Sequence, residues 1–162
     1  MEIEPLPLTP ERFGPFGDVI AASPAARRPM NEARFDVFAG LARIDISGGR
    51  LNVSVARSRT PTVLPYRFDT IERHPLGSQA FVPLAPFRFV VVVAAPAEDV
   101  EASDLHAFVT NGHQGINYLK GTWHMPLIAL EAGQEFLVMD RLSDGDNCEE
   151  RVLGESVTLR AL

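Results

Sequence analysis

Apolar residues along this chain fall into short runs, and no long helical stripe is present. Between Leu51 and Val55 every second residue is apolar, which is the two-residue period of a half-buried β-strand. Four consecutive valines within Arg88–Ala94 predict a strand that is buried on both faces. Turn residues separate such runs at intervals of roughly 8 to 12 residues, a spacing typical of all-β sandwiches and barrels. The pattern therefore predicts an all-β fold.

The expected strands are the apolar runs that proline, glycine, asparagine and aspartate bound. They are Ile3–Leu6, Val19–Ala21, Arg34–Phe38, Leu41–Ile46, Leu51–Arg57, Phe68–His74, Gln79–Val82, Arg88–Ala94, Leu105–Thr110, Ile116–Leu119, Trp123–Leu130, Glu135–Asp140 and Ser156–Leu159. Thr9 and Pro10 predict the start of a short helix, because threonine caps helices and proline suits the first helical position. Ser23–Met30 has the composition of a surface loop. One or two short helices are expected in total.

Length and charge restrict the class of protein. With 162 residues the chain is expected to form one domain, residues 1–162, with a real hydrophobic core. Its net charge of −6 argues against nucleic acid or an anionic membrane surface as a partner, and leaves a small molecule as the expected ligand. Cys148 is the sole cysteine, and the longest apolar run, Phe89–Pro96, is too short to span a bilayer. These features and the absence of a signal-peptide pattern predict a cytoplasmic protein.

Two segments, Ile71–Pro83 and Gly115–Leu127, carry the candidate chemistry. They hold two of the four histidines, each beside other polar residues within strand-like sequence. Burying such groups without partners costs about 1 to 3 kcal/mol each, so their placement predicts a pocket. In a strand Glu72 and His74 share one face, and a turn brings Gln79 back beside them. His124, with Tyr118 and Lys120 before it, belongs to the second segment.

The other histidines and the cysteine have plainer interpretations. His106 and His113 are expected on the surface. Cys148 is interpreted as a small buried or half-buried side chain, since no histidine lies near it in sequence to activate it. His74 and His124 themselves could be structural residues whose hydrogen bonds are satisfied within the core.

The two segments together resemble the double motif of the cupins. Glu72-x-His74-x4-Gln79 has the spacing of the first cupin motif, with Glu in the first His place and Gln in the Glu place. Gly121-x2-His124 matches the second motif. The resemblance implies a cupin-like β-barrel, that is, a double-stranded β-helix. It leaves open a divalent metal such as Ni or Mn, with His74, Gln79 and His124 as candidate ligands and Glu72 beside them.

Longer strings resemble one family, the ureidoglycolate lyases. The strings are ERHPLGSQAF, VVVVA, AFVTNGHQGINY, WHMPL and FLVMDR with its trailing DNC. The likeness runs from Leu6 onward and is weakest across Pro24–Gly49. It implies a homodimeric lyase of allantoin degradation that splits ureidoglycolate into glyoxylate and urea.

The residues offer groups for that chemistry. Either His124 or His74 would act as a base on the substrate hydroxyl, with Glu72 fixing a tautomer. Lys120 or Arg57 would bind the substrate carboxylate, and Gln79 with Tyr118 would bind the urea end. Arg141 and Asp140 are further candidates for substrate contact.

Several of these residues also have bland interpretations. Lys120 has the sequence context of a solvated turn residue, and Arg57 and Arg141 lie at strand ends where rim ion pairs are common. Two other functions also stay open. One is a metal-dependent cupin isomerase or dioxygenase, and the other is a non-catalytic cupin-like module that binds a small acid and regulates a partner.

Overall fold

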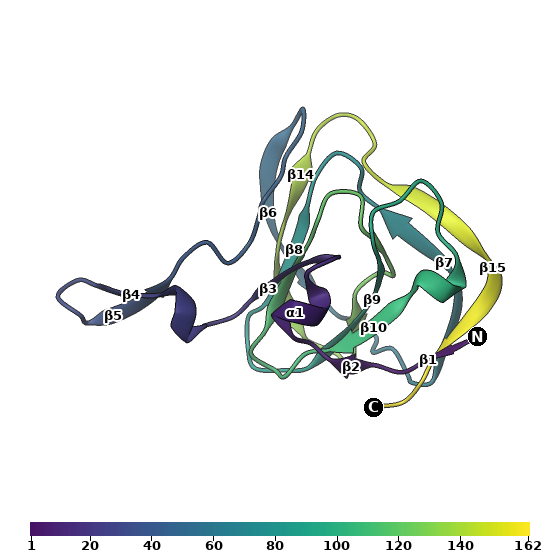
Figure 1. The fold of residues 1–162 in the computed structure, drawn as a ribbon, viewed down its shortest axis with the longest axis horizontal. Helices are drawn as coiled ribbons and strands as arrows, with labels where there is room; N and C mark the ends of the chain where they lie inside the picture. The colour runs from purple at the N-terminus through teal and green to yellow at the C-terminus, as the bar shows by residue number, and fades with distance from the viewer.

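Two curled β-sheets enclose a common interior in the computed structural model, which describes residues 1–162 (Figure 1). This is a cupin-like β-barrel, and the all-β prediction is confirmed. The first sheet, called sheet A, has the order β1 (Glu2–Ile3), β15 (Glu149–Leu159), β7 (Tyr66–Arg73), β12 (Trp123–His124), β9 (Phe89–Ala94), β10 (His106–Val109) and β2 (Leu6–Pro7), with β13 (Ile128–Ala129) also paired to β9. Sheet B has the order β3 (Gly17–Ile20), β11 (Gly115–Tyr118), β8 (Gln79–Pro83), β14 (Glu135–Leu142) and β6 (Arg50–Arg57).

Helical structure is limited to three short pieces, α1 (Pro10–Phe13) and the 3₁₀ helices η1 (Pro24–Ala26) and η2 (Ala102–Asp104). The Thr9 hydroxyl accepts a hydrogen bond from the Arg12 amide at 3.3 Å, so the predicted cap is confirmed. Phe13 at the end of α1 is fully buried and anchors the helix against the barrel. None of these helices has the length or hydropathy that a transmembrane span requires.

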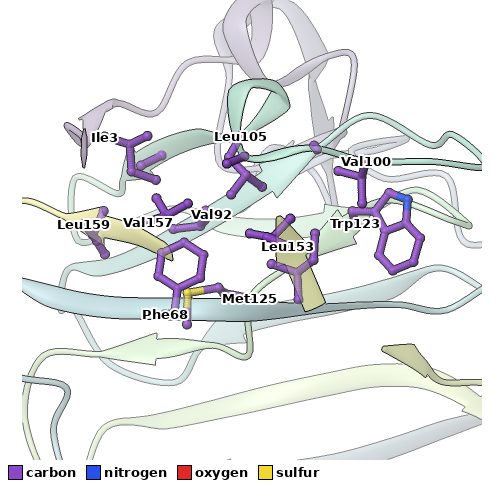
Figure 2. Packing of buried hydrophobic residues seen from close by; sticks show 14 of the residues in the cluster. Ile3, Phe68, Val92, Val100, Leu105, Trp123, Met125, Leu153, Val157 and Leu159 are labelled. Carbon is purple, nitrogen blue, oxygen red and sulfur yellow. The ribbon is translucent and has the colours of Figure 1, made fainter. Parts of the chain in front are cut away.

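The valine-rich strand β9 is buried throughout, as predicted, and separates two apolar cores. Val91 and Val93 face the barrel interior between the sheets, where they join Phe81 and Phe136. Val90 and Val92 point to the opposite side. There sheet A curls over a second core that includes Ile3, Phe68, Val92, Val100, Leu105, Trp123, Met125, Leu153, Val157 and Leu159 (Figure 2).

The structure corrects three predicted elements. Ser23–Met30 is not wholly a loop, because β4 (Arg27–Met30) pairs with β5 (Phe35–Phe38) in a hairpin. Leu41–Ile46 is not a strand. Its backbone binds side chains instead: the Arg43 amide donates to the Asp18 carboxylate and the Asp45 amide to the Ser78 hydroxyl. The strand expected over Trp123–Leu130 is interrupted between β12 and β13, where Pro126 lacks the N–H that a ladder needs.

The edge strand β6 differs from its prediction in burial. Its alternating apolar residues Leu51, Val53 and Val55 remain 50%, 58% and 57% exposed. They lie on the outer face of sheet B, because the residues paired with Val53 and Val55 on β14 are Met139 and Leu137, which alternate with the buried Phe136 and Val138. The alternation that predicts a half-buried strand is therefore present, but nothing in this chain covers its apolar side.

Candidate active site

His74 and His124 lie side by side inside the barrel, as the two-segment hypothesis required. In sheet A His124 is paired with Glu72 on β7 and with Val93 on β9. Residues opposite one another in a sheet point to the same face, so Glu72 and His124 face the interior with Val93. His74 is two residues beyond Glu72, just after β7 ends, and its ring centroid lies 5.1 Å from that of His124.

Backbone carbonyls orient both imidazoles. His74 Nδ1 lies 2.6 Å from the Asn147 carbonyl oxygen, and His124 Nδ1 lies 2.9 Å from that of Thr122. A carbonyl oxygen can only accept, so Nδ1 carries the hydrogen in both rings. Both Nε2 atoms are buried and have no hydrogen-bond partner in the protein. In a neutral ring each therefore presents an unused lone pair.

Glu72 supplies a carboxylate to the same place. Its Oε1 lies 3.5 Å from His124 Nε2. The interaction with His124 is the main reason that the pKa of Glu72 is lowered, and it outweighs the opposing effect of burial. Glu72 is thus an anion beside two imidazoles. A carboxylate in this position favours a cation between itself and the rings, whether that cation is a proton or a metal ion.

The three side chains fit a divalent metal ion. One ligand atom from each of Glu72, His74 and His124 lies within 4.8 Å of the others. Imidazole nitrogen and carboxylate oxygen suit Ni²⁺ and Mn²⁺, and a bond from Nδ1–H to a carbonyl is the usual support of a metal-binding histidine. Two of the candidate ligands from sequence, His74 and His124, belong to this cluster, and Glu72 beside them provides its charged ligand.

A cavity of about 210 Å³ opens beside His74. Its walls include His74 and Gln79 from the end of β7 and the start of β8, Asp140 and Arg141 from β14, and the loop 145–148. Arg141 is held by two carbonyl oxygens, with Nε 2.6 Å from that of Ser47 and Nη2 2.8 Å from that of Gly48. Its Nη1 is buried without a partner, so one charged donor remains available.

Tyr118 closes the interior side of the site. It is fully buried on β11, and its ring stacks on His124 with centroids 4.4 Å apart and planes at 24°. Its hydroxyl is buried without a hydrogen-bond partner. Burial, with the charge of Glu72 as a lesser cause, raises the pKa of Tyr118 above its ordinary value. Tyr118 therefore stays a neutral hydroxyl that can donate a hydrogen bond.

The two remaining candidates lie apart from this group. Lys120 pairs with Asp45 at 3.1 Å, and its side chain is 41% exposed. Arg57 pairs with Glu135 at 2.6 Å, with its own side chain 70% exposed. Glu135 is six residues before Arg141 on β14, which at about 3.4 Å per residue separates Arg57 from the cavity by roughly 20 Å. The structure therefore does not bring Arg57 to the site.

Sequence reasoning missed the contribution of the loop that precedes β15. Asn147 orients His74 through its carbonyl and also accepts a bond from the Leu76 amide at 2.7 Å through its side chain. Cys148 is exposed, contrary to prediction, and its thiol donates to Glu72 at 3.6 Å. Loss of hydration and the charge of Glu72 raise the pKa of Cys148 to about 11, so it is not an activated nucleophile. The DNC string was the only available signal of this loop.

The largest hollow on the molecule is elsewhere. It measures about 550 Å³ and lies between Asp99–Ser103 and Arg151–Glu155. It contains no histidine and only one cationic side chain, Arg151, which is already paired with Asp99 at 2.8 Å. The smaller cavity beside His74 is the better candidate, because two residues of its wall, His74 and Arg141, carry buried polar atoms without a partner.

A barrel interior with two oriented imidazoles and a carboxylate, next to a cavity that Arg141 helps to line, defines a cupin-like enzyme for a small molecule. The sequence profile described as ureidoglycolate lyase matches residues 1–160, and the chain belongs to this family. It is 50% identical over 155 residues to the ureidoglycolate lyase of Burkholderia mallei (strain NCTC 10229), covering 94% of this chain and 90% of that protein. The enzyme of the same name from Burkholderia cepacia is 46% identical over 145 residues, covering 88% and 81%. That of Pseudomonas fluorescens (strain Pf0-1) is 43% identical over 155 residues, covering 94% and 92%.

Proposed function

We propose that this protein cleaves ureidoglycolate to glyoxylate and urea by acid–base elimination at Glu72, His74 and His124. The observation that carries the mechanism is the pair of buried Nε2 atoms that have no hydrogen-bond partner in the protein and lie beside an ionised carboxylate. Membership of the ureidoglycolate lyase family supplies the substrate.

The reaction needs one base and one acid, and no hydrolytic nucleophile. In ureidoglycolate a hydroxyl, a carboxylate and a urea nitrogen are bonded to one carbon. A base removes the hydroxyl proton, the oxygen–carbon bond becomes a carbonyl, and the carbon–nitrogen bond breaks with its electron pair going to nitrogen. An acid protonates that nitrogen, and glyoxylate and urea leave. Each positioned acid or base contributes about 10²- to 10⁴-fold.

We infer different roles for the two histidines from their surroundings. His74 forms no ion pair with a carboxylate, whereas His124 Nε2 lies 3.5 Å from Glu72, so the lone pair of His74 Nε2 is the one free to take the hydroxyl proton. His124 Nε2 faces the carboxylate, which stabilises a proton held between them. We therefore assign His74 as the base and His124, paired with Glu72, as the acid for the departing nitrogen.

The remaining polar groups would orient the substrate. Arg141 Nη1 is the cationic donor for the substrate carboxylate, and the two carbonyls of Ser47 and Gly48 hold its guanidinium still. Gln79 offers an amide to the urea end. The Tyr118 hydroxyl, which stays protonated, can donate to a substrate oxygen. Lys120 and Arg57 have no part in this scheme, because each is paired with a surface carboxylate.

Glu72, His74 and His124 would also be the residues to hold a divalent ion. Such an ion, when bound, supplies a Lewis acid that polarises a substrate oxygen. The rest of the scheme needs only the groups of the chain: Arg141 and Gln79 position the substrate, and the hydrogen bonds to Asn147 and Thr122 keep the imidazoles aimed at it. The proposal also includes assembly as a homodimer.

The test is product analysis with racemic ureidoglycolate. Purified protein should release glyoxylate and urea in equal amounts, with no ammonia beyond the spontaneous background. Release of ammonia instead of urea would show hydrolysis of the ureido group and would overturn the elimination. Allantoate, which lacks the hydroxyl that the base must deprotonate, serves as the control and should give no product.

A further inference from the structure

The hairpin of β4 and β5, together with η1, projects from the barrel; we call residues 24–40 the arm (Figure 1). None of its hydrogen bonds or ion pairs reaches the barrel: its two ion pairs, Arg27 with Asp36 at 2.8 Å and Arg34 with Glu32 at 3.1 Å, both lie within the hairpin. At its tip Asn31, Glu32 and Ala33 have positive φ angles of 53°, 56° and 63°, a backbone region that is costly for residues other than glycine. A two-stranded hairpin alone is only marginally stable in water, so an arm of this kind calls for support from outside.

One face of the arm is largely apolar, although Arg28 also belongs to it. Met30 and Phe35 are paired in register, and Val37 is on the same face as Phe35 because it is two residues away. Met30 is 45% exposed and Phe35 is 58% exposed, whereas the opposite face carries the Arg27–Asp36 ion pair. The arm is therefore amphipathic, and two large apolar side chains of this face stay exposed in the single chain.

A second uncovered apolar surface lies on the outer face of sheet B. Leu51, Val53 and Val55 form a row along β6, next to the half-buried Leu137 and Met139 of β14. β6 is also the edge of the sheet, and its eight residues leave one side of the backbone without a partner strand. A long, exposed apolar edge strand is a surface at which another chain pairs or packs.

We infer that a second copy of this chain covers both surfaces, with the apolar face of each arm packed on the β6 face of the other copy. This takes up the homodimer of the proposed function and assigns its contact surface. Every copy carries both halves of the contact, which is what a two-fold symmetric dimer requires. The arm leads through residues 41–49 into β6 and projects away from its own barrel (Figure 1).

The surface is of a size suited to this role. The five exposed side chains Met30, Phe35, Leu51, Val53 and Val55 each present on the order of 90 Å² of apolar surface, or roughly 450 Å² per copy, as the centre of an interface that needs about 800 Å² per partner. Contiguous rows of exposed apolar side chains are rare on the free surface of a monomeric protein. A second copy, which brings a matching row, is therefore a better occupant than a charged or extended ligand.

The segment that leaves the arm also connects this surface to the active site. The Ser47 and Gly48 carbonyls hold Arg141, and Asp45 binds both the Ser78 hydroxyl and Lys120. Docking of the arm on a second copy would hold residues 41–49 in place at the end that joins the arm. The dimer contact and the cavity wall are thus parts of one continuous stretch of chain.

The test uses sedimentation velocity on the full-length chain, without any substrate, over a range of protein concentration. The native protein should sediment as a dimer. Phe35→Asp on the arm and Val53→Glu on β6 should each raise the dimer dissociation constant at least about 100-fold, a factor of ten for each of the two symmetry-related contacts. Val152→Glu is the matched control, because Val152 is 70% exposed on β15 and lies outside both surfaces; this variant should remain dimeric.

Each result decides the inference. A monomeric native protein, or a dimer that survives both substitutions, overturns it. Loss of the dimer in Val53→Glu alone overturns the role of the arm. Both positions are exposed within the single chain, so circular dichroism and thermal unfolding should show folded variants. Glyoxylate release, measured separately, tests the lyase proposal and does not depend on the outcome here.

Discussion

His124 Nε2 lies 3.5 Å from Glu72 Oε1, and the other nitrogen of the ring already donates to the Thr122 carbonyl. If the ring were neutral, two acceptors would face one another inside the barrel. Only a cation between them, a proton or a metal ion, makes this arrangement favourable. The same pair of atoms therefore serves either as the acid of an elimination or as two ligands of a metal centre.

Asparagine at either histidine tests the acid–base assignment. An asparagine amide can keep the bond that Nδ1–H makes to the backbone carbonyl but offers nothing at the position of Nε2. We expect His74→Asn and His124→Asn each to lower kcat by about 10² to 10⁴-fold, measured as glyoxylate release. His106→Asn, at an exposed histidine outside the cavity, should leave kcat unchanged. Full activity in a folded His74→Asn protein would remove His74 from the mechanism.

Metal binding provides a readout that is independent of turnover. Protein treated with a chelator and then dialysed should bind Ni²⁺ at one site per chain in isothermal calorimetry, because two imidazoles and a carboxylate meet within 4.8 Å. His124→Asn should weaken binding by at least about 10-fold to 100-fold. Gln79→Ala should weaken binding less than His124→Asn, because an amide oxygen is a weaker ligand than an imidazole nitrogen. Undiminished Ni²⁺ binding to His124→Asn would place the ion elsewhere.

Arg141 is expected to act through substrate binding. Removal of its guanidinium in Arg141→Met loses a charge-assisted hydrogen bond worth about 1.5 to 3 kcal/mol, so KM should rise roughly 10- to 100-fold. Arg141→Lys should recover only part of this loss, because lysine cannot bond both carbonyls and the substrate with a planar fork. Arg57→Met is the control. Its exposed ion pair with Glu135 lies at the opposite end of β14 from Arg141. Steady-state kinetics of this variant should therefore give the KM and kcat of the native protein.

The sequence identified the barrel and the centre of the site because strand periodicity and the two histidine motifs are local signals. Glu72 and His74 could be placed on one face from spacing alone, and His124 was joined to them by the resemblance of Gly121-x2-His124 to the second cupin motif. Arg57 could not be excluded in the same way, since its distance from Arg141 depends on the register of β6 against β14. The bonds from Asn147 and Thr122 were invisible for a different reason: they use backbone carbonyls, which every residue has.

The exposed face of β6 shows a further limit of sequence reasoning. The alternation of Leu51, Val53 and Val55 correctly indicated a strand with one apolar side, but a pattern cannot tell whether the covering surface belongs to the same chain. The segment after the arm was mistaken for a strand because its apolar residues alternate. Its backbone instead bonds to Asp18 and Ser78, contacts that only the tertiary fold creates.

Asp18 should make stability depend on pH, because it joins β3 to the segment that follows the arm. Its carboxylate accepts hydrogen bonds from the Arg43 amide at 2.8 Å, from Arg43 Nε at 2.9 Å and from Asn117 Nδ2 at 3.0 Å. Burial alone would raise the pKa of Asp18, but these bonds outweigh it and hold the pKa below its ordinary value of 3.8. A carboxyl group whose pKa is lowered on folding stabilises the protein above its unfolded pKa, and this contribution is lost as the pH falls through the folded value.

Asp18→Asn should therefore lower the free energy of unfolding by about 1 to 2 kcal/mol at pH 7, since hydrogen bonds to a charged group are lost. The difference between the native protein and the variant should shrink as the pH falls below the ordinary pKa of 3.8, where the native carboxyl also takes up a proton. Urea denaturation at a series of pH values measures both quantities. Asp36→Asn, which alters an exposed ion pair on the arm, is the control and should show a small difference at every pH. If the difference in the free energy of unfolding between the native and Asp18→Asn proteins stayed constant from pH 7 to pH 3, the charge of Asp18 would not be what stabilises the fold.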